Sequence, residues 1–262
     1  MDATIVAVEP GQPVVVRVAA VLRALAAHEP DGVCTTDVGR VCGLPRATAH
    51  RLLVSLRAEG LADRDESSGR WLLGAEQYLL GLAAARRYDV ADVARPYVEQ
   101  LARVTGESAF FSARRGDETV CLVRQDGSFP LRSHVLHVGI RFPLGVASAG
   151  LVILAHGTDR ELEEYLGKVD LQGAWGASHS SESLRERVSE TRTAGFAVNP
   201  GLLVEGSWGM GAAVFDRDGR PAWALSLTGV EQRFGPARRP ELGRALLEHA
   251  HGLTQALAPT AH

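Results

Sequence analysis

The sequence lacks the features that mark several large classes of protein. It has three cysteines among 262 residues, an odd count without the spacing of a metal site or a disulfide framework. It contains no run of about 18 uncharged apolar residues, the length that a membrane span needs. Its first basic residue, Arg17, follows two acids, Asp2 and Glu9, which argues against a signal peptide. We therefore expect a cytoplasmic protein with reduced thiols and no membrane spans.

Positive charge is also scarce. The formal net charge is −3, and Lys168 is the only lysine. Residues 1–88 contain ten arginines against ten acidic residues, so this part of the chain has no overall basic field. Residues 44–57 are the exception, with three arginines, one histidine and no acid. Any binding to nucleic acid must depend on this short stretch.

Residues 35–61 have the pattern of a helix, a turn at Gly43-Leu44 and a second helix. Pro45 stands where the first turn of the second helix begins, a position at which the missing N–H of proline costs nothing. Gly60 supplies the left-handed cap that ends the helix. Apolar residues at helical spacing form one stripe on the second helix, namely Ala49, Leu52, Leu53 and Leu56. This layout is typical of a helix-turn-helix DNA reader, although an ordinary amphipathic surface helix has the same periodicity.

The residues outside this apolar stripe are the candidate DNA contacts. A helix of this length spans roughly 20 Å and fits a major groove about 12 Å wide, with its N-terminal residues nearest the base edges. The candidates on the second helix are Arg46, Ala47, Thr48, His50, Arg51 and Arg57, and Thr36 joins them from the start of the first helix.

A predicted hairpin follows the second helix. Residues 61–73 contain two short strand-like runs around a turn-rich centre. A helix-turn-helix followed by such a hairpin is a winged helix. Arg64 and Arg70 lie near the wing, where they are placed to touch phosphates, contacts that position a protein without carrying sequence information. Apolar residues at helical spacing from 14 to about 27 predict the third helix of the unit.

The chain divides near residue 75. We expect a linker helix over residues 75–90 and a second helix over about 92–105, with a break near Arg95-Pro96. One face of the linker helix carries Ala75, Tyr78, Leu79, Leu82 and Arg86. This face either meets a second copy of the chain or packs only on its own chain.

The remainder of the chain alternates predicted strands and helices. We expect strands over about 107–114, 118–124, 131–137, 196–199, 208–216 and 221–229, and helices over about 145–156, 159–166, 181–194 and 236–257. Several strands joined by hairpins indicate an antiparallel sheet flanked by helices, and hence an α+β domain.

No catalytic or cofactor-binding constellation stands out. Ser178-His179-Ser180-Ser181 and Ser207 offer hydroxyls and a histidine, but no Gly-x-Ser-x-Gly elbow accompanies them. His134 and His137 point to opposite faces of the predicted strand, and no third metal ligand is evident. The glycine-rich turns lack the lysine and hydroxyl of a nucleotide-binding loop. We therefore expect no catalytic residue, no metal and no cofactor.

Both halves carry short motifs in a recognisable order. The first half contains Thr36-Asp37-Val38, Gly43-Leu44-Pro45, Thr48 to Leu53, Gly60-Leu61 and Leu73-Gly74. The second half contains Pro96 to Leu101, Thr105-Gly106-Glu107, Gly195-Phe196-Ala197, Glu205-Gly206, Val214-Phe215-Asp216 and Leu225 to Gly229. With these motifs the chain resembles the isocitrate lyase regulator (IclR) family of bacterial transcription factors over residues 14–255.

The resemblance implies three parts. These are a winged helix-turn-helix domain at 14–74, a linker helix at 75–90 and a GAF-like effector-binding and oligomerisation domain at 91–257. It also implies that the linker helix brings two DNA domains together. A homodimer or homotetramer is then expected to bind double-stranded operator DNA, and the small basic footprint makes this pairing necessary for useful affinity.

The resemblance further implies an effector pocket, formed by Ser148, Ala149, Gly150, Met210, Ala213, Ser226 and Thr228. Ser226 and Thr228 share one strand face, and the helix start at Ser148 favours a carboxylate. At the position of Ala213, many members of the family carry Pro or Cys. In the stretch before it they carry small aliphatic residues and an arginine, where this chain has Trp208 and Met210. We therefore expect a small organic acid with an aromatic or extended apolar part as the effector.

Three alternatives remain open. Ser226 and Thr228 can hydrogen-bond only within a half-buried sheet, which would leave no pocket. A catalytic C-terminal domain would turn over a substrate. An architectural DNA binder would show DNA affinity that no metabolite alters.

Overall fold

The computed structural model describes residues 12–85, 90–131 and 135–258. Contacts within the chain divide it into two compact units, Met1–Tyr88 and Asp89–His262. Each unit is described by itself.

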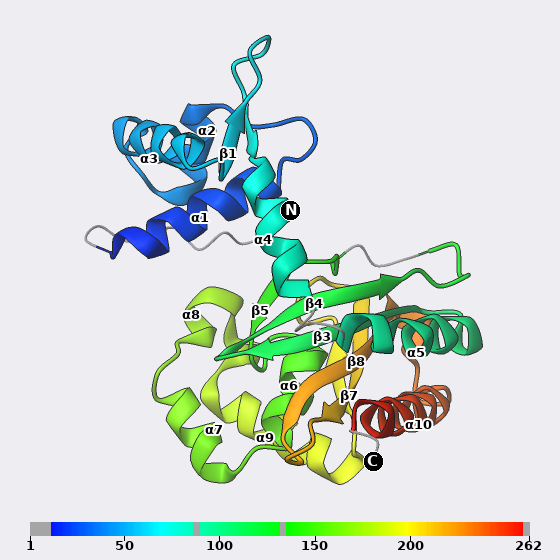
Figure 1. Cartoon of the computed structure of the whole chain (residues 1–262). Helices are drawn as coiled ribbons and strands as arrows, with labels where there is room; N and C mark the ends of the chain where they lie inside the picture. Colours follow the sequence, from blue (N-terminus) through cyan, green and yellow to red (C-terminus); the bar gives the residue numbers. More distant parts are fainter. Residues whose placement is uncertain (1–11, 86–89, 132–134, 259–262) are drawn as a thin grey trace. The chain divides into compact units, whose positions relative to one another are not determined.

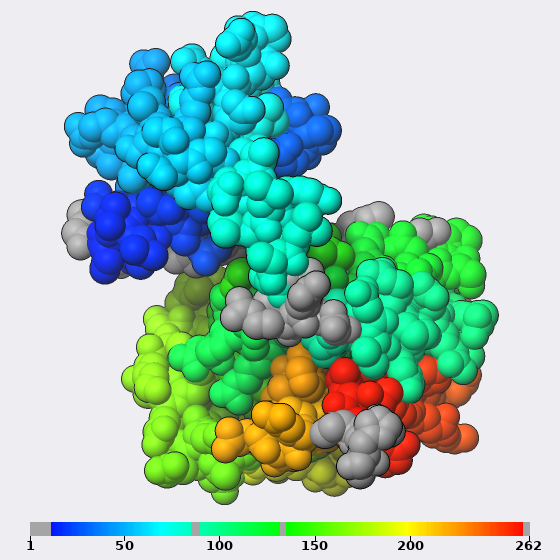
Figure 2. Space-filling model, viewed as in Figure 1, coloured from blue at the N-terminus to red at the C-terminus, as the bar shows by residue number. Residues whose placement is uncertain are grey.

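The N-terminal unit is a winged helix. Its elements in chain order are α1 (Val14–Ala26), α2 (Thr35–Cys42), α3 (Arg46–Ala58), β1 (Ala62–Arg64), β2 (Trp71–Leu73) and α4 (Ala75–Ala85), as Figure 1 shows. β1 and β2 pair antiparallel, and the loop between them is the wing, which projects from the body of this unit (Figure 2). The helices, the turn and the hairpin expected for a winged helix are therefore confirmed.

A small apolar core holds this unit together. Leu25 from α1, Leu53 from α3 and Trp71 from the wing are all fully buried in it. The Trp71 indole Nε1 donates a hydrogen bond to the Thr35 hydroxyl at 2.9 Å, which ties the wing to the start of α2. The stripe predicted on α3 faces this core, with Leu52 only partly buried.

Close packing at the α2–α3 turn depends on two glycines. Gly43 ends α2 in the left-handed conformation, with a φ of 64°. A Cβ at Gly39 would lie 2.9 Å from the Leu44 carbonyl oxygen, so only glycine lets the turn approach α2 this closely. The sequence indicated that Pro45 is the first residue of α3. In the structure Pro45 is instead the N-cap, one position before the helix begins. The recognition helix thus starts at Arg46.

The C-terminal unit is built on a six-stranded antiparallel sheet. The strands are β3 (Ser108–Arg115), β4 (Glu118–Gln125), β5 (Arg141–Pro143), β6 (Ala197–Pro200), β7 (Ser207–Phe215) and β8 (Pro221–Val230), in the order β5-β4-β3-β8-β7-β6. The helices are α5 (Val90–Thr105), α6 (Ser148–Ala155), α7 (Asp159–Leu166), α8 (Leu171–Trp175), α9 (Ser181–Ala194) and α10 (Arg239–Leu257), with short 3-10 turns η1 (Ala177–His179) and η2 (Glu231–Phe234). The α+β prediction is confirmed.

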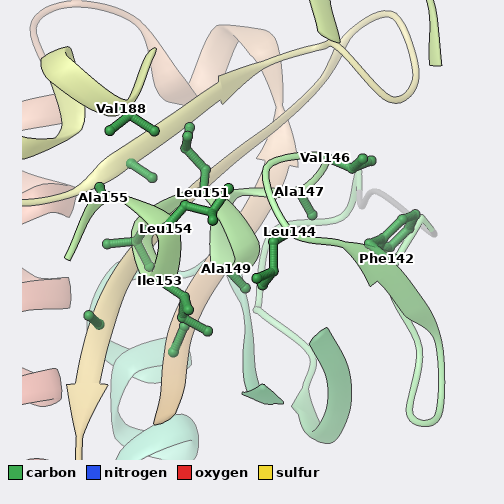
Figure 3. Close-up of a cluster of buried hydrophobic side chains, with 14 of the residues drawn as sticks. Phe142, Leu144, Val146, Ala147, Ala149, Leu151, Ile153, Leu154, Ala155 and Val188 are labelled. Carbon is green, nitrogen blue, oxygen red and sulfur yellow. The ribbon is translucent and has the colours of Figure 1, made fainter. Parts of the chain in front are cut away.

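The two faces of the sheet have separate cores. On one face the sheet packs against α5 and α10, with Phe111, Leu227 and Leu246 among the buried residues. On the other face it packs against α6 and α9, and Figure 3 shows Leu151, Ile153 and Leu154 of α6 in this second core. Because neighbouring residues of a strand face opposite ways, each strand serves both cores.

Two predictions about this unit were wrong, and one short helix was missed. The strand expected at 131–137 is absent from its described part, since the chain turns at Gly139 and bonds to β4 from Gly139 onward. Residues 132–134, which include His134, lie outside the described residues. The break expected at Pro96 does not occur, because α5 continues through it with Ala94 and Val98 buried on the sheet. The sequence also did not indicate α8, which is a single short turn.

Candidate DNA-binding and effector sites

The recognition helix α3 presents a row of free polar side chains. Arg46, His50 and Arg51 are exposed, and Thr48 is half-buried. Within the described residues, Arg46 and His50 have no hydrogen-bond or ion-pair partner, and Arg51 makes one long bond of 3.4 Å to the Thr48 hydroxyl. Their donors are therefore available to a ligand such as DNA.

The remaining α2 and α3 candidates extend this surface. Ala47 is exposed beside Arg46, and Arg57 is exposed in the last turn, about 16 Å along the helix from Arg46. Thr36 is exposed in the first turn of α2, where helix N–H groups without an internal partner favour phosphate. All the candidates on these two helices are thus at least partly exposed.

The two wing arginines are already engaged within the protein. The Arg64 Nε donates to the Gly69 carbonyl at 3.1 Å, and its guanidinium lies over the Trp71 ring at 5.4 Å. The Arg70 Nη1 donates to the Gly32 carbonyl at 3.1 Å, which holds the base of the wing to the loop after α1. Both side chains remain exposed. The contacts that the structure shows for both arginines therefore shape the wing, and their exposed guanidinium groups leave room for a further contact.

An acid shapes the tip of the wing. The Asp65 Oδ1 accepts hydrogen bonds from the Ser67 hydroxyl and from both the backbone N–H and the hydroxyl of Ser68. These bonds lower the pKa of Asp65 to about 2. The tip is therefore a fixed turn that carries negative charge, which limits how closely it approaches phosphate.

The candidate effector residues lie where β7, β8 and α6 meet. Ser226 and Thr228 on β8 are paired with Gly211 and Gly209 on β7, so all four face α6. The Ser226 Oγ and the Thr228 Oγ1 are buried, and neither has a hydrogen-bond partner within the described ranges of the chain. The expectation that these hydroxyls bond within the sheet is therefore not met.

The start of α6 lies directly over the two glycines. A Cβ at Gly211 would lie 3.0 Å from the Ser148 carbonyl oxygen, and a Cβ at Gly209 would lie 3.3 Å from the Ser148 Oγ. Ser148, Ala149 and Gly150 are all buried, and no side chain caps the helix. The first N–H groups of a helix have no partner inside it, so buried donors point from α6 at this place.

Met210 does not join these residues. It pairs with Leu227 and lies in the core beneath α5 and α10, on the opposite face of the sheet from Ser226. Trp208 lies on that opposite face as well, and Arg239 stacks on its ring. The expectation that Met210 and Trp208 surround the ligand is wrong. Side chains alternate between the two faces of a strand, so Ser226 and Thr228 share one face of the sheet while Met210 and Trp208 lie on the other. Ala213 faces α6, two residues beyond Gly211.

Asn199 is a buried polar residue beside the candidate effector site that the sequence analysis did not single out. It is buried on β6 opposite Gly209, and its Nδ2 donates to the Val146 carbonyl at 2.8 Å. Its Oδ1 accepts a bond from the Leu202 N–H at 3.0 Å. Figure 3 shows Val146 in the loop that leads into α6. An asparagine two residues before a glycine in a strand was the available signal.

Among the described residues no group of three or more His, Cys, Asp or Glu is placed to hold a metal. Burial raises the pKa of Cys42 to about 11 and that of Cys121 to about 12, while Cys34 is exposed. The Ser180 hydroxyl caps α9 by accepting from the Ser183 N–H. No helix in the described ranges is long and apolar enough to cross a membrane.

A winged helix with a free recognition helix, followed by a separate α+β unit, defines the class of helix-turn-helix transcription regulators. Family models place the chain within that class. Residues 14–66 match the IclR helix-turn-helix domain, and residues 82–255 match the C-terminal domain of the bacterial transcriptional regulator IclR. The chain belongs to the IclR family, and it is a DNA-binding transcription regulator and not an enzyme.

Similar proteins with curated names are regulators. The glycerol operon regulatory protein of Streptomyces griseus is 32% identical over 229 residues, which cover 86% of this chain and 87% of that protein. The regulator BhcR of Paracoccus denitrificans is 28% identical over 229 residues, 87% of this chain and 82% of that protein.

Solved structures of the family have the same fold. An IclR regulator from Alicyclobacillus acidocaldarius superposes with a TM-score of 0.76 at 25% identity, over 94% of this chain and 99% of that one. An IclR homologue from Microbacterium hydrocarbonoxydans, complexed with 4-hydroxybenzoate, gives a TM-score of 0.73 at 25% identity over the same shares.

Proposed function

We propose that this regulator binds operator DNA through α3 and the wing, and that a small organic acid bound between β7, β8 and α6 alters this binding. The observation that carries the proposal is the pair of buried hydroxyls without partners, Ser226 and Thr228, beside the uncapped start of α6. A buried polar group left unpaired costs about 1–3 kcal/mol, so a ligand that satisfies these groups gains that much at each.

The chemistry of this site favours an acid. Helix N–H groups and the positive end of the helix dipole at Ser148 stabilise a negative charge. Hydroxyls at Ser226 and Thr228 can donate to the same carboxylate or to another polar group of the ligand. The homologue complexed with 4-hydroxybenzoate supports an aromatic acid as the ligand class.

On the DNA side, the assignment follows the exposed row on α3. Arg46 and Arg51 lie in the N-terminal half of the helix and read bases, since this half enters the major groove. Arg57 and Thr36 contact phosphate, as do Arg64 and Arg70 in addition to their structural bonds. The remaining assigned contacts on α3 are Ala47, Thr48 and His50.

We propose a homodimer or homotetramer as the binding species. In α4 the apolar side chains of Tyr78, Leu79 and Leu82 are more than half exposed. A row of this kind on one helix is suited to pairing with the same row of a second copy. Two copies also double a DNA footprint that is small in one chain.

The site assignment is tested by calorimetry with 4-hydroxybenzoate and a panel of other small acids. The variant carries Ser226→Ala and Thr228→Val, and its control carries Ser189→Ala and Thr193→Val on the exposed side of α9. We expect the parent and the control to bind the same acid with equal affinity, and the site variant to bind it about tenfold or more weakly. Equal affinity in all three proteins would contradict the assignment.

A further inference from the structure

The arginines along α9 differ in what they contact. The Arg185 guanidinium makes two bonds of 2.7 Å to the Glu163 carboxylate. Arg192 donates to the Ala155 carbonyl at 2.7 Å, at the end of α6. The three guanidinium nitrogens of Arg187 are buried, and none of them has a hydrogen-bond partner among the residues that the structure describes. Arg187 is therefore a buried cation without an anion.

A buried cation of this kind lacks a negatively charged partner. Removing an ion from water costs several kcal/mol, and a buried charge without a partner recovers none of this. Burial lowers the pKa of Arg187, and Glu190 on the same helix acts in the opposite direction. A guanidinium nevertheless stays protonated in proteins, and its planar donors match the two oxygens of a carboxylate. The group that Arg187 lacks is a planar anion.

His179 lies next to Arg187 and is itself incompletely satisfied. It is buried, with its Nδ1 3.0 Å from the Trp175 carbonyl oxygen and its Nε2 3.5 Å from the Val146 carbonyl oxygen. A neutral imidazole has one N–H and can donate to only one of these oxygens, whereas the charged ring can donate to both. Burial and the charge of Arg187 both lower the pKa of His179 and favour the neutral ring.

An anion bound at Arg187 would shift His179 toward its charged, doubly protonated form. It would offset the positive charge of Arg187, which is the charged group acting on His179, and so make the second proton on the imidazole less costly. The doubly protonated ring would then donate to both carbonyl oxygens. Binding of an anion and uptake of a proton are thus expected to occur together.

We propose that Arg187 and His179 form a carboxylate-binding site between α9 and η1, which pack against each other. Arg187 donates two hydrogen bonds to the carboxylate, and His179 takes up a proton when it binds. The proposal deepens the proposed function and rests on it for the link to DNA affinity. Its ligand is either the second carboxylate of the effector or a separate small monocarboxylate.

The position of the site favours the second carboxylate of the effector over a separate monocarboxylate. The Val146 carbonyl that faces His179 also accepts the Asn199 bond, and Val146 lies two residues before Ser148. Asn199 and Thr228 are separated by β7, and adjacent strands are about 4.8 Å apart, so the two polar places, Thr228 on β8 and the Val146 carbonyl beside His179, lie on the order of 10 Å apart. One elongated acid with a carboxylate at each end would span them.

Calorimetry with terephthalate, benzoate and acetate tests the proposal on the full chain. The variant is Arg187→Gln, and the control is Arg185→Gln two residues away. We expect the parent and the control to bind terephthalate with uptake of a proton, measured as a dependence of the heat on the ionisation enthalpy of the buffer. Arg187→Gln should weaken this binding by about tenfold to 100-fold and abolish the uptake.

The smaller acids distinguish the two sources. If Arg187→Gln weakens terephthalate but not benzoate or acetate, the carboxylate is the second one of an elongated effector. If it weakens acetate equally, the site takes a separate monocarboxylate. Terephthalate binding with the same affinity and proton uptake in Arg187→Gln as in the parent would overturn the proposal.

Stability without ligand gives a second readout. Removing an uncompensated buried charge should leave the Tm of Arg187→Gln equal to or a few degrees above that of the parent. A lower Tm with unchanged acid affinity would assign Arg187 a structural role and overturn the proposal. The Ser226→Ala, Thr228→Val variant separates the two claims, since its failure to affect binding would remove the β8 site and leave the Arg187 result standing.

Discussion

Replacing Arg46 and Arg51 with alanine should separate base reading from folding. Both side chains are exposed and make at most one long internal hydrogen bond, so each substitution should change the free energy of unfolding by less than about 0.5 kcal/mol. An arginine held bidentately to guanine is worth about 1–3 kcal/mol of discrimination. The two residues lie about 7.5 Å apart along the helix and should act nearly independently. The double variant should lose about 2–6 kcal/mol of binding to its operator.

The assay is fluorescence anisotropy with an operator fragment, obtained by sequencing the DNA that the purified protein retains. Arg23→Ala is the matched control, because Arg23 is exposed on α1 of the same unit. Loss of affinity for the operator alone, with nonspecific DNA bound as before, indicates base contacts. An equal loss on all sequences, with the salt slope reduced by about one for each arginine, indicates phosphate contacts instead. Unchanged operator affinity would refute the assignment of α3 as the recognition helix.

Three further predictions concern packing, thiol reactivity and assembly. Gly211→Ala should destabilise the C-terminal unit by about 1–3 kcal/mol, measured by urea unfolding, since its Cβ would press on the backbone at the start of α6; an unchanged midpoint would contradict this close contact. Iodoacetamide at pH 8 should modify Cys34 within the time that leaves Cys42 and Cys121 intact, because burial raises the pKa of both; mass spectrometry showing equal labelling would refute their burial. Isolated residues 1–74 should be monomeric in light scattering and bind the operator far more weakly than the full chain, and equal affinity would argue against pairing through α4.

Features that depend on local periodicity could be predicted from the sequence. α7 and α9 begin and end at the residues expected, and the Gly43 turn and the wing follow from turn residues and alternating strands. The same rules failed where tertiary contacts decide. The alternating pattern at 131–137 suggested a strand, but in its described part Leu136 is buried in the core and Val135 packs partly buried against it, without strand pairing. Pro96 suggested a break, but packing of α5 on the sheet outweighs one lost backbone bond.

The sequence predicted only part of the effector site. Strand alternation correctly placed Ser226 and Thr228 together, and applying it to β7 would have excluded Met210 at once. Arg187 could not have been found, since an arginine in the run Leu-Arg-Glu-Arg-Val resembles a solvated helix face. Its burial arises from the packing of α9 on β6 and α6, which no local pattern encodes.

The central claim, that an acid bound at β8 and α6 changes DNA binding, is tested most directly by measuring operator affinity at saturating ligand. Anisotropy titrations would be made with and without the acid identified by calorimetry, on the parent and on the Ser226→Ala, Thr228→Val variant. We predict a change of about fivefold to 150-fold in the operator Kd of the parent, the range of a typical coupling, and none in the variant. An operator Kd of the parent that stays the same while calorimetry shows the site occupied would contradict the account.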